Sequence, residues 1–440
     1  MGNTERAVEQ PEKKALGRTS QAFLVEHVHL LARSLLATEI GGIAVDLDYL
    51  VKRGQELQEK ILTLKPAMRK AACGQVECAE VAAWREKLDA YKTERGRKNC
   101  KRPEFSFDSP KQLADLLYRR LRLPVQTDPK TRNVSTGDLA LESLEKAHPL
   151  IPLLREYRGH QKVYGSYIEG TLERLVEGRV YPEFRVNGTK TGRISHVNPN
   201  MGQLPREGGI RGIYIPDPGC VFITADYSQL EVVLAAHFSR DEQLLRVVNE
   251  GASLHDITAA ALQIERHTAK TINFAIQYGA GVSKIRDILG CDQAAAERAL
   301  AKYWDTYAGL KRLVDDCHRC VEEGRPITNP FGRSRHFPAA FKDKWEKERA
   351  KRQSFNALIQ GTGGDLTSRA FYLADDRLRG LGIGKSLFTV HDEVIIQAKK
   401  AHWEKAQEIL VSAMESVGRE IELTVPLKAQ PSGPTERWED

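Results

Sequence analysis

The chain has 440 residues, of which 41% are hydrophobic and 28% are charged, and its formal net charge is +7. The chain is longer than one hydrophobic core usually organises, which predicts two or three domains. The apolar content excludes a disordered protein. No apolar run reaches the roughly 18 residues that a membrane-spanning helix needs. The mild positive charge alone does not separate a nucleic-acid-binding protein from any other basic enzyme. Seven sparse cysteines and a polar N-terminus without a secretory signal indicate a cytoplasmic protein.

The first half of the chain is predicted to be mainly helical. Apolar residues recur with helical spacing and are interrupted by Gly41-Gly42, where the pattern indicates a break. Ser109-Pro110 before KQLADLLYRRL predicts an N-capped helix with proline in its first turn. The helical segments expected here span residues 22–61, 62–101, 110–121 and 139–176.

The stretch Lys92–Arg102 carries six basic residues in eleven. A solvated loop or helix end is the ordinary interpretation of such a run. A loop that contacts phosphate groups is the sharper interpretation, and it needs support from elsewhere in the chain.

The second half combines helices with a few strands. Cys220–Ala225 predicts a buried strand that ends at Asp226, and two strand-like runs flank His391-Asp392-Glu393, which predicts a hairpin with a polar tip. The helices expected here span residues 230–237, 264–279, 283–324, 349–381 and 403–421. The fold class predicted is therefore α+β, mostly helical, with one small antiparallel sheet.

Asp226 and Asp392 are each predicted at the end of a rigid strand. Carboxylate oxygens are the ligands that Mg²⁺ prefers, and two metal ions about 3.5–4 Å apart can clamp an in-line phosphoryl displacement. Taken singly, either aspartate is more often a turn or cap residue. The hypothesis that the two aspartates bind metal together therefore needs support from other motifs in the chain.

One face of the segment 264–279 carries charge and aromatic rings. Arg266, Lys270, Phe274 and Tyr278 recur at a spacing of four residues and share a broad helical face. Cations beside aromatic rings suit a nucleoside triphosphate. The alternative is an amphipathic helix whose aromatics belong to the core and whose cations reach solvent.

Three segments in this order resemble the polymerase motifs of family A, the DNA polymerase I family. They are Asp226-Tyr-Ser-Gln-Leu-Glu231, Arg266-xxx-Lys270-xx-Asn273-Phe274-xxx-Tyr278-Gly279 and Val390-His-Asp-Glu393. Further segments resemble the family's primer-template loop, its template-contacting helix and the start of its thumb. These are Thr191–Ser195 with Pro199–Pro205, Arg352–Thr362, and Glu39–Asp46 with Ser109–Leu113. The resemblance covers roughly residues 25–440, motif by motif.

The resemblance implies a right-hand polymerase fold with a helical thumb and fingers around a palm that holds the small sheet. A flexible leader would occupy 1–24, the thumb 25–175, the fingers 240–345, and the palm 176–239 and 346–440. Lys92–Arg102 would then grip duplex phosphates from the thumb without reading sequence.

The resemblance also implies a role for each site residue. Asp226, Asp392 and the Tyr227 carbonyl would hold two Mg²⁺ ions, with Mn²⁺ as a substitute, and Glu393 would support the catalytic site. Lys270 would donate a proton to the leaving pyrophosphate, Glu231 would exclude a ribose 2′-hydroxyl, and Phe274 would pack on the sugar and disfavour dideoxynucleotides. The dNTP would contact Ser228, Gln229, Glu231, His255, Arg266, Lys270, Phe274 and Tyr278. Primer-template DNA would contact Arg193, Asn200, Gln203, Arg352, Asn356, Gln360 and His391.

Some residues depart from the family pattern. Val232-Val233 stands where the family has Leu-Arg, and Ser253-Leu254-His255 stands for its Asp-Ile-His. The short stretch from His255 to Arg266 resembles phage members more than bacterial ones. Gly363-Gly364 replaces a pair of alanines, which we expect to loosen the start of that helix.

The expected function is DNA-directed DNA synthesis from primer-template DNA and dNTPs. We expect the protein to be a monomer in the cytoplasm of a bacterial or phage-infected cell. Replication accessory proteins are expected as further partners, and no membrane is expected to be involved. Only about 25 residues precede the thumb, so we expect neither a 3′–5′ proofreading domain nor a 5′ nuclease. The alternative is a catalytically silent primer-template-binding replication protein of the same fold. An RNA polymerase or reverse transcriptase is a third reading, and Glu231 argues against ribonucleotide incorporation. Gly380–Ser386 is one residue short of a P-loop and precedes a strand, which argues against an ATPase.

Overall fold

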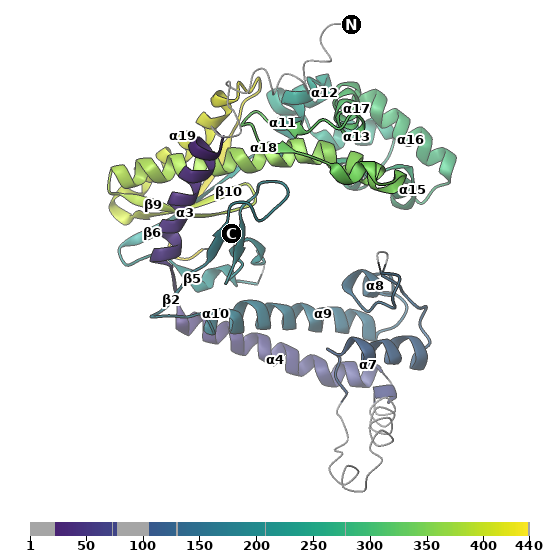
Figure 1. The fold of residues 1–440 in the computed structure, drawn as a ribbon. Coiled ribbons are helices and arrows are strands. Elements are labelled where there is room, and N and C mark those ends of the chain that lie inside the picture. Colours follow the sequence, from purple (N-terminus) through teal and green to yellow (C-terminus); the bar gives the residue numbers. More distant parts are fainter. Residues whose placement is uncertain are drawn as a thin grey trace. The chain divides into compact units, whose positions relative to one another are not determined.

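The computed structural model describes residues 23–72, 74–76, 105–128, 131–206, 208–277 and 279–438 (Figure 1). Tyr278, the basic stretch Lys92–Arg102 and nearly all of the expected leader lie outside these ranges. The chain divides into two compact units, residues 46–175 and the remainder, and each is described on its own. In the ranges that the structure describes, the helices are too short or too polar to cross a membrane.

The unit formed by residues 46–175 is helical. Its long helix α4 packs against α9, and a core of buried leucines with Tyr157 lies between the helices. Asp46 caps α4 by accepting a hydrogen bond from the backbone of Tyr49, and Ser109 caps α7 as predicted, with Pro110 at its first position. The elements are α4 (Leu47–Ala71), α7 (Pro110–Ala114), a π-helical segment (Asp115–Arg120), α8 (Asp138–Glu142), α9 (Leu150–Val163), a second π-helical segment (Tyr164–Glu169) and α10 (Gly170–Leu172). The single helix expected over 139–176 is therefore wrong, because turns interrupt it between α8 and α9.

The second unit is built around a four-stranded antiparallel sheet in the order β11-β6-β10-β9. Its strands are β6 (Cys220–Tyr227), β9 (Gly384–Val390), β10 (Glu393–Lys399) and β11 (Ala429–Thr435). The strand ending near Asp226 and the hairpin with a polar tip are both confirmed. The central strands β6 and β10 are buried along most of their length, which explains why they read as continuous apolar runs.

Within the described ranges, three smaller sheets correct the expectation of one sheet. They are β2 (Arg179–Val180) with β1 (Ile43–Val45) and β5 (Tyr214–Ile215), β3 (Glu183–Arg185) with β4 (Ser195–Val197), and β7 (Ile327–Thr328) with β8 (Ser334–Arg335). The extended pattern of residues 178–187 indicates β2 and β3, whereas the other strands of two or three residues are too short to show an alternating pattern. The strand β11 was also missed, because Pro431, Gly433 and Pro434 argue against a strand; it lies at the sheet edge, where proline is tolerated.

Helices cover this sheet and continue beyond it. The longest, α18, contacts α19, β9, α11, α17 and α3, and Figure 1 shows it running from α19 toward the group α15–α17. The helices are α3 (His29–Gly41), α11 (Leu230–Ser239), α12 (Glu242–Glu250), α13 (Leu254–Leu262), α14 (Arg266–Gln277), α15 (Val282–Leu289), α16 (Gln293–Thr306), α17 (Ala308–Glu322), α18 (Lys344–Gly380) and α19 (Trp403–Glu420). Shorter helical segments are Leu24–Val28, Met201–Gln203, Arg211–Ile213, Pro338–Phe341 and Lys400–His402.

Gly363 and Gly364 lie in the middle of α18, not at its start, and the helix continues through them. A Cβ atom at Gly363 would lie 3.1 Å from a methyl carbon of Leu230, and one at Gly364 would lie 3.2 Å from the backbone nitrogen of Arg193. The expectation that the glycines loosen a helix start is therefore wrong. They allow α11 and the loop of Arg193 to approach α18 closely.

Candidate active site

Asp226 lies on a strand, and Asp392 lies in the turn that leads into the neighbouring strand. Asp226 is near the end of β6, and Asp392 is in the turn between β9 and β10. Glu393 stands opposite Asp226 in the ladder, and the Tyr227 amide donates to the Asp392 carbonyl at 3.4 Å. Burial raises the pKa of Asp226, and the negative charge of Asp392 raises that pKa further. The fold therefore brings the two predicted carboxylates into each other's electrostatic field.

This donor set fits a hard divalent cation. In the part of the chain that the structure describes, no three histidine, cysteine, aspartate or glutamate side chains are grouped to hold a metal ion. Two carboxylates supplemented by backbone oxygen and water suit Mg²⁺, which keeps several waters and rarely takes an all-protein cage. The Tyr227 backbone is well anchored, because its buried hydroxyl donates to the Met414 carbonyl on α19 at 2.9 Å.

Arg193 connects two acidic groups of the site. Its Nη2 atom lies 3.0 Å from Oδ1 of Asp392 and 3.6 Å from Oε1 of Glu231. Glu231, at the start of α11, also accepts hydrogen bonds from the amides of Gln360 on α18 and Gln277 on α14. Burial raises the pKa of Glu231. Gln277 was not among the predicted site residues, because nothing in the local pattern shows that it faces Glu231.

The predicted face of α14 is present and accessible. Lys270 is exposed, and Phe274 is 49% exposed, so this ring is not a core residue as the amphipathic alternative required. The Phe274 ring lies 6.2 Å from that of His255, whose pKa is lowered by burial and by the charges of Arg266 and Lys270. Arg266 pairs with Asp256 at 2.9 Å. Lys270 makes no ion pair with any described residue, so its ammonium group is available to a ligand.

His255 is held in place by a buried polar chain. Its Nδ1 atom lies 3.1 Å from the amide nitrogen of Asn273, and the Asn273 carbonyl accepts from Thr258 at 3.0 Å. Thr258 in turn contacts the Tyr307 hydroxyl at 2.8 Å. Asn273 is part of the motif on α14, and the structure gives it a positioning role toward His255.

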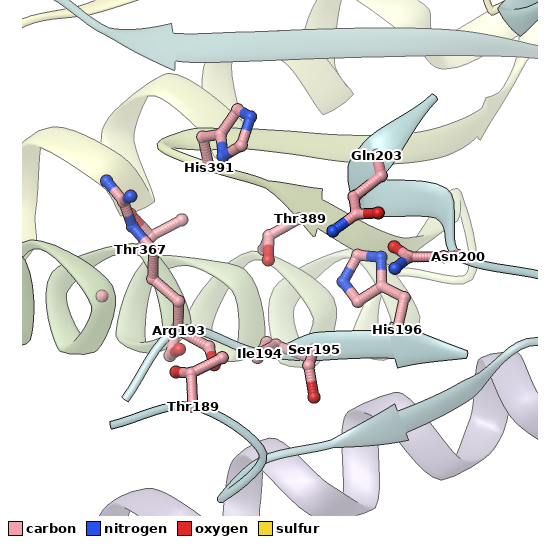
Figure 2. Close-up of a pocket in the computed structure, with 13 residues that line it drawn as sticks. Thr189, Arg193, Ile194, Ser195, His196, Asn200, Gln203, Thr367, Thr389 and His391 are labelled. Carbon is pink, nitrogen blue, oxygen red and sulfur yellow. The ribbon is translucent and has the colours of Figure 1, made fainter. Parts of the chain in front are cut away.

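Four of the seven predicted DNA-contacting residues line one cavity of about 270 Å³ (Figure 2). They are Arg193, Asn200, Gln203 and His391. Burial and the nearby Arg193 charge lower the pKa of His391. The other three residues, Arg352, Asn356 and Gln360, recur every four residues on α18 and share a face of that helix.

His196 and Arg211 were missed by the sequence reasoning. His196 is 3% exposed and lines the same cavity, and burial lowers its pKa to about 4. Arg211 is buried, and its Nη1 atom lies 3.9 Å from Oε2 of Glu393. Burial raises the pKa of Glu393, which Arg211 partly offsets. Ser228 and Gln229 form the turn from β6 into α11, with Gln229 in a left-handed conformation.

Comparison with known proteins decides the family. Residues 80–440 match the family model described as DNA polymerase family A. The chain belongs to DNA polymerase family A. This family A chain is similar to a thermostable DNA polymerase I of Thermus filiformis, with 33% identity over 74% of the chain and 41% of that relative. It is also similar to the DNA polymerase I of Geobacillus stearothermophilus, with 29% identity over 99% of the chain and 48% of that relative.

The fold agrees with this family. The chain is similar to a solved structure described as the POL domain of Pol1 from M. smegmatis in complex with DNA primer-template and dNTP. The TM-score is 0.79 and the identity 25%, over 94% of this chain and 70% of that one. The family A chain spans less than half of the length of the two DNA polymerase I relatives named above.

Proposed function

We propose that this chain is a DNA-directed DNA polymerase that adds dNTPs to a primer 3′ end. The observation that carries the proposal is the approach of Asp226, on β6, and Asp392, in the turn that leads into the neighbouring strand β10. Family membership supports it, and so does the solved relative that was captured with primer-template and dNTP.

In this proposal Asp226, Asp392 and the Tyr227 carbonyl hold two Mg²⁺ ions, for which Mn²⁺ can substitute. When bound, the metal ions neutralise charge that develops on the attacking and leaving oxygens. Glu393 supports the site from the position opposite Asp226, and the buried Arg211 lies near its carboxylate. A cation bound at Asp392 would compete with Arg193 for the same carboxylate, because Arg193 already pairs with its Oδ1 atom.

The incoming dNTP is proposed to lie along α14. Arg266 and Lys270 bind its phosphates, and Lys270 donates a proton to the leaving pyrophosphate. Phe274 packs on the sugar, and its half-exposed ring supports that role. His255, whose lowered pKa favours the neutral ring, offers a hydrogen bond rather than a charge. The remaining dNTP contacts are proposed to be Ser228, Gln229, Glu231 and Tyr278.

Primer-template DNA is proposed to contact Arg193, Asn200, Gln203, Arg352, Asn356, Gln360 and His391. Contacts to the minor groove can check base-pair geometry without reading sequence, because acceptors lie at similar places in every pair. Arg193 then exchanges its carboxylate partner Asp392 for such an acceptor.

The domain assignment stays a proposal. The thumb would span 25–175, the fingers 240–345 and the palm 176–239 with 346–440, and the separately packed helical unit of 46–175 supports the thumb assignment. The short connection between α13 and α14 supports a phage-like subtype. We propose a monomer that acts in the cytoplasm of a bacterial or phage-infected cell, with replication accessory proteins as further partners.

A primer-extension assay with Mg²⁺ and all four dNTPs tests the proposal. We expect template-dependent extension by the pure protein, and none without a divalent cation. Tight primer-template binding with no extension would favour the silent replication protein instead. Replacing dNTPs by ribonucleotides, and the DNA template by RNA, tests the third reading in the same format.

A further inference from the structure

A buried ion pair lies within the second unit and has no role in the mechanism above. Asp365, in the middle of α18, has a fully buried side chain. Its carboxylate accepts hydrogen bonds from Nη2 of Arg333 at 2.7 Å and from Nε of Arg333 at 2.9 Å. Asn329 donates to the same carboxylate at 2.7 Å, and Nε2 of His27 lies 3.3 Å from it. The arginine fork therefore binds both carboxylate oxygens in a fixed geometry.

This pair stays charged over the working pH range. Burial alone would raise the pKa of Asp365, but the neighbouring His27 ring, the hydrogen bonds from Arg333 and the Arg333 charge outweigh it and lower the pKa to about 2. A buried pair of this kind is weak evidence for stability, since desolvation offsets much of the attraction. Stability alone therefore does not explain why Arg333 and Asp365 are held in this fixed geometry.

The Arg333 guanidinium lies against the backbone of Gly192. A Cβ atom at residue 192 would lie 2.5 Å from the guanidinium carbon, and Gly192 has φ +78°, so only glycine fits this contact. The next residue is Arg193. Its backbone nitrogen lies against Gly364 of α18, as noted above, and its carbonyl accepts a hydrogen bond from Thr189 at 2.7 Å. Figure 2 shows Thr189 and Arg193 at the edge of the cavity.

We infer that Arg333, held by Asp365, is a positioning residue that fixes the loop of Gly192 and so aims Arg193 at Asp392 and the primer-template cavity. This inference rests on the proposed polymerase function. Arg333 belongs to the segment between β7 and β8, so a short two-stranded sheet outside the cavity determines where Arg193 points. The two glycines that flank this arrangement, Gly192 and Gly364, are required by the same close packing.

A double-mutant cycle tests the inference. Arg333→Lys keeps the charge but loses the fork that binds both oxygens of Asp365. We expect it to lower the primer-extension rate on the order of tenfold to a hundredfold, the cost of misplacing a site group by about 1 Å. In an Arg193→Ala background the same change should lower the rate less than about twofold, because its effect passes through Arg193. Equal losses in both backgrounds would overturn the inference.

Primer-template affinity, measured by fluorescence anisotropy without dNTP, provides a second readout of the same cycle. This readout separates the inference from the proposed function. If the wild-type protein does not extend a primer, the proposed polymerase function is refuted. If the affinity losses of Arg333→Lys and Arg193→Ala are additive in the double mutant, the positioning role of Arg333 is refuted. Arg379→Lys is the matched control, since Arg379 binds both oxygens of Asp375 on the same helix. It should leave extension and affinity unchanged.

Gly192→Ala covers the case in which Arg333→Lys fails to fold. The added methyl group would lie 2.5 Å from the Arg333 guanidinium carbon, so the loop and the guanidinium must move apart while the Arg333 and Asp365 side chains are both retained. We expect the same pattern, a large loss in the wild-type background and almost none beside Arg193→Ala. A Gly192→Ala protein with wild-type extension and affinity would contradict the inference.

Discussion

The Arg193 guanidinium bridges Asp392 at 3.0 Å and Glu231 at 3.6 Å. Arg193 thus forms an ion pair with Asp392, the carboxylate that we propose as a magnesium ligand. The Arg193 side chain also lines the proposed DNA cavity. DNA binding would compete for Arg193, and metal binding would compete for Asp392, so each event would weaken this ion pair. The arrangement links the two events through a single residue.

Removing Arg193 should therefore strengthen metal binding while weakening catalysis. Arg193→Ala leaves Asp392 without its cation, and we expect Mn²⁺ to bind the DNA-free protein up to about fivefold more tightly, since the lost pair stabilises the metal-free state by about 1 kcal/mol. Electron paramagnetic resonance of free Mn²⁺ measures this affinity. Arg286→Ala, an exposed arginine on α15, is the control. Weaker Mn²⁺ binding by Arg193→Ala would show that the pair does not compete with metal.

Asp392→Ala should abolish primer extension and leave primer-template affinity within about threefold of wild type. The change removes one of the two carboxylates that would hold the metal ions. Extension assays and anisotropy measure the two effects separately. Asp376→Ala, which removes a carboxylate with 73% exposure, should behave like wild type. Extension that persists in Asp392→Ala would remove this residue from the metal site.

Glu231→Ala should relax the exclusion of ribonucleotides. The Glu231 carboxylate is held by Gln277 and Gln360, so its position is rigid enough to crowd a 2′-hydroxyl. We expect the ratio of dNTP to rNTP incorporation to fall about tenfold to a hundredfold, the scale of steric discrimination in a pocket. Single-turnover incorporation measures this ratio. Glu250→Ala at the exposed end of α12 is the control, and an unchanged ratio in Glu231→Ala would refute the gate.

Lys270→Arg should separate phosphate binding from proton donation. Arginine keeps the positive charge but does not lose a proton under working conditions. We expect the KM for dNTP to stay within a few-fold while kcat falls at least about a hundredfold, the usual contribution of a general acid. Lys302→Arg, on the exposed surface of α16, should change neither value. A near-normal kcat in Lys270→Arg would assign the proton transfer to another group.

Asp217 should contribute stability that disappears in acid. Burial alone would raise its pKa, but hydrogen bonds from Gln397 and Arg179 and the Lys385 charge lower the pKa from 3.8 to about 2. Because the folded pKa lies below the unfolded one, the contribution is complete above pH 4 and is lost as pH falls toward 2. With a discount for partial exposure, Asp217→Asn should cost about 1 kcal/mol at neutral pH.

Denaturant unfolding of Asp217→Asn and wild type from neutral pH downward measures this contribution. The stability difference should narrow between pH 4 and pH 2. Asp287→Asn serves as the control, because Asp287 pairs with the adjacent Arg286 at the surface. A difference that stays constant down to pH 2 would show that the Asp217 charge is not what stabilises the fold.

The parts of the site that the sequence predicts well depend on local patterns. Apolar runs mark β6, β9 and β10, and a spacing of four residues marks the face of α14, so Asp226, Asp392 and Lys270 could be placed on the correct elements. The strands β1, β5 and β11 could not be predicted. Two are too short to show a pattern, and β11 contains proline and glycine and exists because β6 offers it an edge to pair with.

The amino-acid sequence by itself determined the family, the helical character of the chain and the elements that carry the proposed ligands. Only the tertiary structure decided which side chains meet. Arg193 joins Asp392, Gln277 joins Glu231, and Arg333 reaches Asp365 across separations of 199, 46 and 32 residues. Local propensities carry no information about such pairs, because their geometry follows from how helices and strands pack around the sheet.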